Sequence, residues 1–180
     1  MMRAKQGHEI KYETAPPLNA IYLSGTDALP RDQHSATSDS ALRLYILCHF
    51  IDRGRAPTVA EMAAALRAST RTIRAGLRRL VQTHAFCLQE NGELWRAAPF
   101  SAVPTAFPVQ AGNRRWWGNC IWDALGIPAM LDRDARIDAA CGCCNHRMLL
   151  EISNGKLCAP AGTIHIAVPA CHWYDDIVFT

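Results

Sequence analysis

The stretch NCIWDALGIP places a thiol and a carboxylate, Cys120 and Asp123, three positions apart. Positions i and i+3 of an α-helix lie on one face, so the two side chains would share a small volume. If Cys120 opens a helix, the unpaired backbone N–H groups there favour a thiolate. Trp116, Trp117 and Trp122 would form an apolar wall that disfavours the charged carboxylate, so that Asp123 could hold a proton near neutral pH. Chance also produces this spacing, so the spacing alone leaves a catalytic pair open.

Most of the eight cysteines follow residue 119 and crowd into the last third of the chain. We expect reduced thiols, and therefore metal or catalytic use rather than a disulfide framework. The run CGCCNH, with the later cysteines, invites a zinc hypothesis, but it lacks the paired C-x-x-C knuckles of zinc modules, and structural zinc is not expected. The sequence leaves open whether four of these cysteines bind metal: Cys143, Cys144, Cys158 and Cys171.

The overall composition is apolar enough to form a hydrophobic core. The chain has 180 residues, is 49% hydrophobic and has a formal net charge of +3. This length suits one medium domain or two small ones, and the charge is too mild to identify a nucleic-acid binder. We find no secretory signal and no stretch apolar enough for a membrane span, so we expect a cytoplasmic protein without membrane contact.

The pattern along the chain predicts three parts. Residues 1–35 read as a flexible leader, because prolines, glycines and serines occur there without periodicity. Residues 36–98 contain an apolar helical stripe that ends at Gly54, a second helix with Thr58 and Glu61 as a capping box, and a third helix capped by Ser69. An Asn-Gly turn at 91–92 then predicts a hairpin. Three helices and a hairpin make a winged helix-turn-helix.

Five arginines would line the third helix, which enters the major groove in DNA-binding winged helices. They are Arg67, Arg71, Arg74, Arg78 and Arg79. The alternative is that they only keep the exposed face of the helix soluble, because a fold does not by itself carry a function.

Residues 99–180 predict a small mixed α+β domain. SAVPTAFPVQAG reads as an edge strand or a crossover into this domain, and an aromatic-rich helix follows. The short alternating stretches ARIDAAC, RMLLEI and TIHIAVP then predict a small sheet, with a turn at Asn154-Gly155. The fold class is therefore α+β, with an N-terminal winged helix followed by a catalytic α+β domain.

The segment GNCIWDALGIPAMLDRDARIDAAC resembles the core of the alkylmercury lyase (organomercurial lyase) family. In that family a Cys-x-x-Asp is followed by an apolar stretch with proline, an Ala-Arg pair and a further cysteine. The resemblance extends over roughly residues 38–180, because the preceding winged helix and the APFSAVPT connection also fit the family's two-part layout.

The resemblance implies an activity and roles for three residues. Cys120 matches the cysteine that takes the organomercurial, Asp123 matches the aspartate that manages the proton, and Cys141 matches a cysteine regarded as structural. The family reaction is protonolysis of a carbon–mercury bond to a hydrocarbon and Hg(II), without a cofactor. Mercury is soft and seeks thiolates, while carbon must receive a proton. Mercury would be held transiently by Cys120 and Asp123, first as a thiol adduct of the organomercurial substrate and then as the product, which a mercuric reductase could accept.

The chain departs from the family pattern at the second catalytic cysteine. That residue is expected shortly after a stretch like HWYDDIVFT, where this sequence ends. Either the sequence stops just short of it, or another thiolate replaces it. Cys171, Cys143 and Cys144 are the candidate replacements.

Two other functions remain possible from the sequence. One is a winged-helix DNA-binding regulator whose cysteine-rich half senses mercury or another soft metal, and this predicts salt-dependent binding to duplex DNA. The other is a family member that binds mercury without cleaving the carbon–mercury bond.

Overall fold

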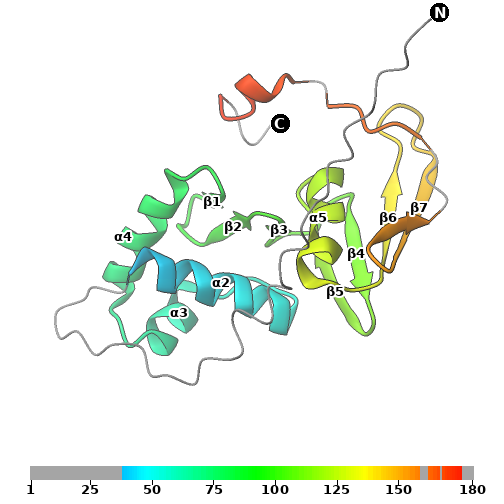
Figure 1. The fold of residues 1–180 in the computed structure, drawn as a ribbon. Helices are drawn as coiled ribbons and strands as arrows, with labels where there is room; N and C mark the ends of the chain where they lie inside the picture. Colours follow the sequence, from blue (N-terminus) through cyan, green and yellow to red (C-terminus); the bar gives the residue numbers. More distant parts are fainter. Residues whose placement is uncertain (1–37, 159–161, 167, 176–180) are drawn as a thin grey trace, which may run out of the picture. The chain divides into compact units, whose positions relative to one another are not determined.

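The computed structural model describes residues 38–158, 162–166 and 168–175. The leader expected over residues 1–35 lies outside this range. The described residues belong to one compact unit, residues 32–180, which carries helices and two antiparallel sheets (Figure 1). The α+β class is thus confirmed.

Three helices come first: α2 (Asp39–Arg53), α3 (Val59–Ala65) and α4 (Thr70–Val81). The predicted N-caps of α3 and α4 are confirmed, and Ser38 caps α2 in the same way. The Ser38 and Ser69 hydroxyls accept backbone N–H bonds from the first turns of α2 and α4, and Thr58 forms the predicted reciprocal capping box with Glu61. Helix α2 ends at Gly54, whose φ of 70° is a left-handed conformation that glycine adopts readily.

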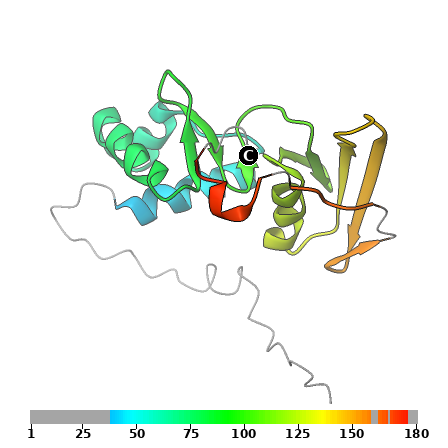
Figure 2. The same ribbon diagram turned by 90° about the horizontal axis from the view of Figure 1, so that it is seen from above.

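A three-stranded antiparallel sheet of order β1-β2-β3 follows, made of β1 (Phe86–Leu88), β2 (Leu94–Ala97) and β3 (Phe100–Ser101). The predicted hairpin is confirmed, since β1 and β2 pair on either side of the Asn91-Gly92 turn. Helix α4 packs against both α2 and α3 and against β1, and Figure 2 shows the three helices gathered beside these strands. The winged-helix assignment of these elements stays a prediction.

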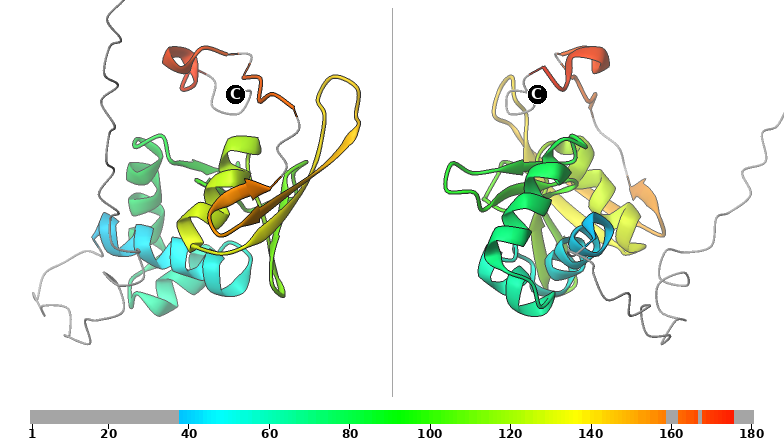
Figure 3. Two further views of the ribbon diagram at one scale, coloured as in Figure 1. Left: turned by 45° about the vertical axis from the view of Figure 1, so that its right-hand side comes forward. Right: turned by 90° about the vertical axis from the view of Figure 1, so that its left-hand side faces the viewer.

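The second sheet has the strand order β5-β4-β6-β7-β8, with every neighbouring pair antiparallel. Its strands are β4 (Pro108–Ala111), β5 (Arg114–Trp117), β6 (Ala135–Ala140), β7 (Arg147–Ser153) and β8 (Lys156–Cys158). The expected turn at Asn154-Gly155 joins β7 to β8. Figure 3 shows the long β6–β7 hairpin extending beyond its neighbours.

Three expectations for this half were wrong. Strand β4 is not an edge strand, because it lies between β5 and β6; Pro108 is tolerated as its first residue, where a missing N–H costs least. The aromatic residues at 116–117 belong to strand β5, not to a helix. The stretch TIHIAVP was expected to form a strand, but its residues 163–166 form none.

One helix connects β5, at the edge of the second sheet, to β6 in its centre. Helix α5 (Ile121–Leu131) packs against β4 and β6 and continues past Pro128 to end at Asp132, which has a φ of 49°. A short 3-10 helix, η1 (Ala170–His172), lies in the C-terminal segment. No helix in the described part of the chain has the length and apolarity that crossing a bilayer requires.

The hydrophobic core runs without interruption through both sheets and the first three helices. The Phe50 ring of α2 stacks on Phe100 of β3, with centroids 5.1 Å apart, and Phe100 in turn contacts the Trp116 ring of β5. The Trp116 indole N–H also donates to the Phe50 carbonyl oxygen over 2.7 Å. Strand β5, which leads directly to α5, is therefore anchored on α2. The division into domains at residues 36–98 and 99–180 stays a prediction.

Candidate active site

Cys120 occupies the N-cap position of α5. Its backbone is extended, with φ −141° and ψ −178°, and its side chain makes no capping hydrogen bond. The thiol is half-buried and not part of a disulfide. The sulfur thus lies at the positive end of the helix, and it is not used as a hydrogen-bonding cap.

Asp123 lies three residues later, in the first turn of α5, and its side chain is largely shielded from water. Burial raises the pKa of this carboxyl group, because the charged form loses its hydration. A hydrogen bond from the Asn119 amide and the positive charge of Arg96 oppose this rise without cancelling it. Asp123 is therefore a carboxyl group that keeps its proton to a higher pH than an exposed aspartate.

Asn119 fixes the orientation of the Asp123 carboxylate. Its side-chain amide donates to Asp123 Oδ2 over 2.8 Å and to the Pro99 carbonyl oxygen over 3.3 Å. One residue thus ties the first turn of α5 to the connection between β2 and β3. This role was not predicted from the sequence, although an asparagine four positions before an aspartate was a usable signal.

Arg96 was also missed, and no local pattern could have revealed it. It lies on β2, far from Asp123 in the sequence, yet its charge acts on the Asp123 carboxyl group. The approach of β2 to α5 depends on the packing of the two sheets, which a single sequence does not encode as a motif.

Gly118 permits the close packing that brings α5 to this position. A Cβ atom here would lie 2.7 Å from the Ala124 backbone nitrogen and 2.9 Å from its Cα. The Gly118 carbonyl oxygen accepts a hydrogen bond of 2.5 Å from the Thr105 hydroxyl, and its N–H donates to the Phe107 carbonyl oxygen over 3.0 Å. The loop between β3 and β4 therefore holds the residues just before Cys120.

Of the three tryptophans expected to form a wall around Asp123, Trp122 is exposed and does not belong to it. Trp122 is 65% exposed, while Trp116 is buried and hydrogen-bonded to α2. Trp117 is half-buried, with the Arg115 guanidinium 4.7 Å from the centre of its ring. The expected wall is wrong for Trp122, because a residue between Cys120 and Asp123 on a helix points away from the face that those two share.

Cys141 lies in the turn between β6 and β7, together with Cys143 and Cys144. Backbone N–H groups of Cys144 and Cys143, and the Cys144 thiol, hydrogen-bond to the Cys141 side chain and lower the pKa of its thiol. This sequence position was expected to be structural, and that role stays a prediction. Within the described residues, no group of three or more His, Cys, Asp or Glu side chains is arranged to hold a metal ion.

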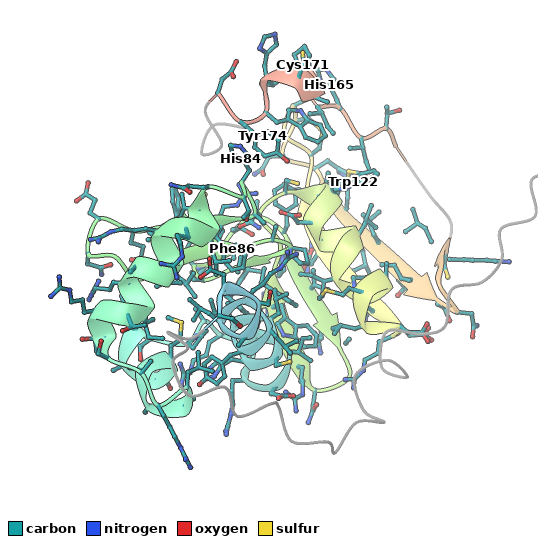
Figure 4. The ribbon with its side chains drawn as sticks, turned by 60° about the vertical axis from the view of Figure 1, so that its left-hand side comes forward. His84, Phe86, Trp122, His165, Cys171 and Tyr174 are labelled. Carbon is teal, nitrogen blue, oxygen red and sulfur yellow. The ribbon has the colours of Figure 1, made fainter. Side chains whose placement is uncertain are left out.

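The remaining cysteines of this half lie on separate elements. Cys158 is exposed on β8, and Cys171 is exposed on η1. The segment that carries Cys171 is anchored by Tyr174, whose ring lies 4.4 Å from that of His84, a contact that Figure 4 shows from the side. The Trp173 indole N–H donates to the Val168 carbonyl oxygen over 2.7 Å.

The arginines of α4 are partly engaged within the protein. Arg79 forms a bidentate ion pair with Asp39, and Arg74 donates to the Asn91 carbonyl oxygen and lies 3.9 Å from Glu93. These contacts give two of the four arginines on α4 a structural partner, and the fifth predicted arginine, Arg67, lies before the helix begins. The DNA-binding interpretation of α4 stays a prediction.

Comparisons with known proteins agree with the geometry of this half. The family model described as alkylmercury lyase matches residues 100–179. The resemblance to the alkylmercury lyases is confirmed. The alkylmercury lyase match includes Cys120, Asp123, Cys141 and Cys171.

A solved structure supports the same fold. The crystal structure of the mercury-bound form of MerB2 superposes with a TM-score of 0.57 at 21% sequence identity, covering 67% of this chain. The chain spans 58% of the length of that protein. At this identity the likeness shows the fold alone. No curated protein matched the sequence.

Proposed function

We propose that the chain is an alkylmercury lyase-type enzyme that cleaves the carbon–mercury bond of organomercurials by protonolysis. The observation that carries the proposal is the start of α5, where Cys120 occupies the N-cap position and Asp123, whose pKa is raised by desolvation, follows in the first turn. Mercury requires a thiolate and the departing carbon requires a proton, and this turn supplies both groups.

The reaction begins with exchange of thiols. The Cys120 thiolate attacks mercury in an R–Hg–S adduct, forms a new sulfur–mercury bond and releases the carrier as a thiolate. No electrons are exchanged with an outside donor, because mercury remains Hg(II) throughout.

The second step breaks the carbon–mercury bond. The electron pair of that bond stays with carbon, which takes the proton held by Asp123 and leaves as the hydrocarbon R–H. The partial burial of Asp123 supports this role, because desolvation raises the pKa of its carboxyl group and so favours the protonated form. Asn119 holds the carboxyl group toward the first turn, since its amide donates to Asp123 Oδ2.

A second thiolate is needed to hold Hg(II) after the carbon has left, and we assign it to Cys171. The family match extends across Cys171 to residue 179, and the thiol is exposed and free of any disulfide. The product Hg(II) is then passed to an external thiol. A mercuric reductase as the acceptor and a cytoplasmic location both stay predictions.

Release of hydrocarbon from a methyl- or phenylmercury thiol adduct tests the proposal directly. We expect Cys120→Ser to release none, because a hydroxyl group does not replace a thiolate as a ligand for mercury. Cys48→Ser, which changes an exposed cysteine on α2, is the matched control and should retain turnover. Gas chromatography of the headspace gives the rate. Full turnover by Cys120→Ser, or no hydrocarbon from the unmodified chain, would overturn the proposal.

A further inference from the structure

The turn that follows α4 makes a ring contact with the C-terminal segment, residues 168–175, which contains η1 and Cys171. The centre of the Tyr174 ring in this segment lies 4.4 Å from the centre of the His84 ring, and the two planes are inclined by 31°. Figure 4 shows the two rings beside each other, with Cys171 farther along the same segment. The contact thus connects the segment of the proposed second thiol to the end of α4.

The C-terminal segment is held together by its own hydrogen bonds. The Trp173 indole N–H donates to the Val168 carbonyl oxygen over 2.7 Å. The His172 imidazole Nδ1 lies 2.8 Å from Asp175 Oδ2. The segment is therefore folded on itself, and an anchor at one of its residues also fixes the position of Cys171.

The ring contact is the specific attachment of this segment to the rest of the protein. Among residues 38–158, 162–166 and 168–175, no hydrogen bond or ion pair joins the segment to the helices or the sheets. An aromatic pair of this kind changes an equilibrium by a factor of roughly 2–12. The segment is therefore attached weakly enough to detach and return repeatedly.

His84 has a backbone conformation that favours glycine. Its φ is 64°, in the left-handed region where many helices end. Its N–H donates to the Val81 carbonyl oxygen over 3.0 Å, directly after the Thr83 N–H donates to the Leu80 carbonyl oxygen over 3.0 Å. Glycine would make this turn with less strain. The turn thus does not require an imidazole ring, whereas the contact with Tyr174 does.

The C-terminal segment lies on the side of the molecule where the proposed chemistry takes place. Figures 1 and 3 show η1 on the side on which α5 begins, and Cys120 is the N-cap of that helix. Two thiolates hold one Hg(II) only if both sulfurs reach the same ion. Detachment of the segment would lower the effective concentration of the second thiol at the first.

We propose that His84 and Tyr174 are positioning residues, whose ring contact holds the C-terminal segment so that the Cys171 thiol takes Hg(II) at the start of α5. The role of Cys171 rests on the proposed function, whereas the attachment of the segment does not. A sulfur–mercury bond forms at Cys171 while its thiol loses a proton to solvent. Mercury stays Hg(II), so no oxidant or reductant is needed.

Hydrogen exchange of the full-length protein tests the attachment without any cleavage step. His84→Gly removes one ring but keeps the turn, so its melting temperature should not fall while exchange in residues 168–175 becomes about 2–12-fold faster. Tyr174→Ala should accelerate exchange equally, and Tyr174→Phe, which keeps a ring, should restore the original rate. Asn145→Gly is the matched control, because it relieves another left-handed residue, with a φ of 57°, outside this contact.

Mercury retention tests whether the attachment serves Cys171. Reduced protein is loaded anaerobically with Hg(II) as its glutathione complex and dialysed against increasing glutathione, and the retained mercury is measured by mass spectrometry. We expect His84→Gly to hold Hg(II) about 2–12-fold less tightly than the original chain. Adding His84→Gly to Cys171→Ser should cause no further loss, because both changes act on the same thiol. In hydrocarbon release, His84→Gly should lower kcat without raising KM.

The outcomes separate this proposal from the proposed function. Unchanged exchange in both His84→Gly and Tyr174→Ala would overturn the attachment. Additive losses of mercury in the double variant would overturn the positioning of Cys171. If the original chain releases no hydrocarbon but its retention of Hg(II) depends on His84 and Cys171 together, the lyase activity is wrong and the positioning role is supported.

Discussion

The Asn119 side-chain amide lies 2.8 Å from Asp123 Oδ2, while its backbone directly precedes Cys120. One residue therefore touches the proposed proton donor and borders the proposed nucleophile. Asn119 also donates to the Pro99 carbonyl oxygen, so its position is set from outside the helix. Asn119 is a positioning residue. Its loss should change the pKa of Asp123 while leaving the fold intact.

Asn119→Ala should shift the pH dependence of hydrocarbon release. The Asn119 amide lowers the pKa of Asp123, so its removal lets burial raise that pKa further. Cleavage requires protonated Asp123, and the rate should fall as pH rises through its pKa. We therefore expect the decline to move to higher pH in the variant. An unchanged pH profile, measured under saturating substrate, contradicts the positioning role.

Asp123→Asn should separate capture of the mercurial from its cleavage. An amide has no acidic proton to give to carbon, so we expect the Cys120–mercury–alkyl adduct to form and hydrocarbon release to slow by about 10²–10⁴-fold. Mass spectrometry of the intact protein detects the trapped adduct. A variant that turns over at the original rate would remove Asp123 from the mechanism.

The same substitution makes a prediction about stability. The folded-state pKa of Asp123 is raised above its unfolded value, so the folded chain binds this proton more tightly. Stability is then lost as pH rises from the unfolded pKa through the folded one. Asp123→Asn carries no such charge, so its stability relative to the original chain should improve with pH across this window. Urea titrations at several pH values, with Asp52→Asn on the exposed end of α2 as the control, measure the difference.

Gly118→Ala and Gly126→Ala form a matched pair around α5. A Cβ atom at 118 would meet the Ala124 backbone at 2.7 Å, which forces the helix to move, and we expect a loss of about 1–3 kcal/mol. At Gly126, inside α5, the nearest atom is the Pro99 Cβ at 3.9 Å, so alanine should add up to about 1 kcal/mol through its helix propensity. Urea denaturation measures both. Equal changes in the free energy of unfolding would show that the close contact between Gly118 and Ala124 does not fix the position of α5.

Cys171→Ser tests the assignment of the second thiol. If Cys171 holds mercury as the carbon leaves, the variant should still capture the organomercurial at Cys120 but lose turnover. Cys158→Ser, which changes another exposed cysteine of the same half, is the comparison and should keep its turnover. Loss of activity in Cys158→Ser but not in Cys171→Ser would assign the second mercury-binding thiol to Cys158 on β8.

Local signals in the sequence predicted the ends of elements well. The caps of α2, α3 and α4, the Asn91-Gly92 turn and the Asn154-Gly155 turn all depend on residues within a few positions, and all are confirmed. Trp116 and Trp117 were predicted to lie in a helix but lie in β5. A strand of four residues between a turn and a helix is too short to show the alternation of apolar and polar residues that identifies a strand.

The surroundings of the site were less accessible from the sequence. Cys120 and Asp123 were recognised by type, spacing and family resemblance, and their placement at the start of α5 agrees with the predicted helix. Arg96 and Pro99 reach the site from β2 and the connection that follows it. Such contacts arise only once two sheets share a core, so no short pattern could report them.

The lack of a capping bond at Cys120 has a consequence for the stability of α5. Serine is among the preferred residues at this position and would stabilise the helix by about 1 kcal/mol. The inactive Cys120→Ser protein should therefore melt at a higher temperature than its active parent. At this one position, the residue that would best stabilise the helix differs from the residue that the proposed chemistry requires.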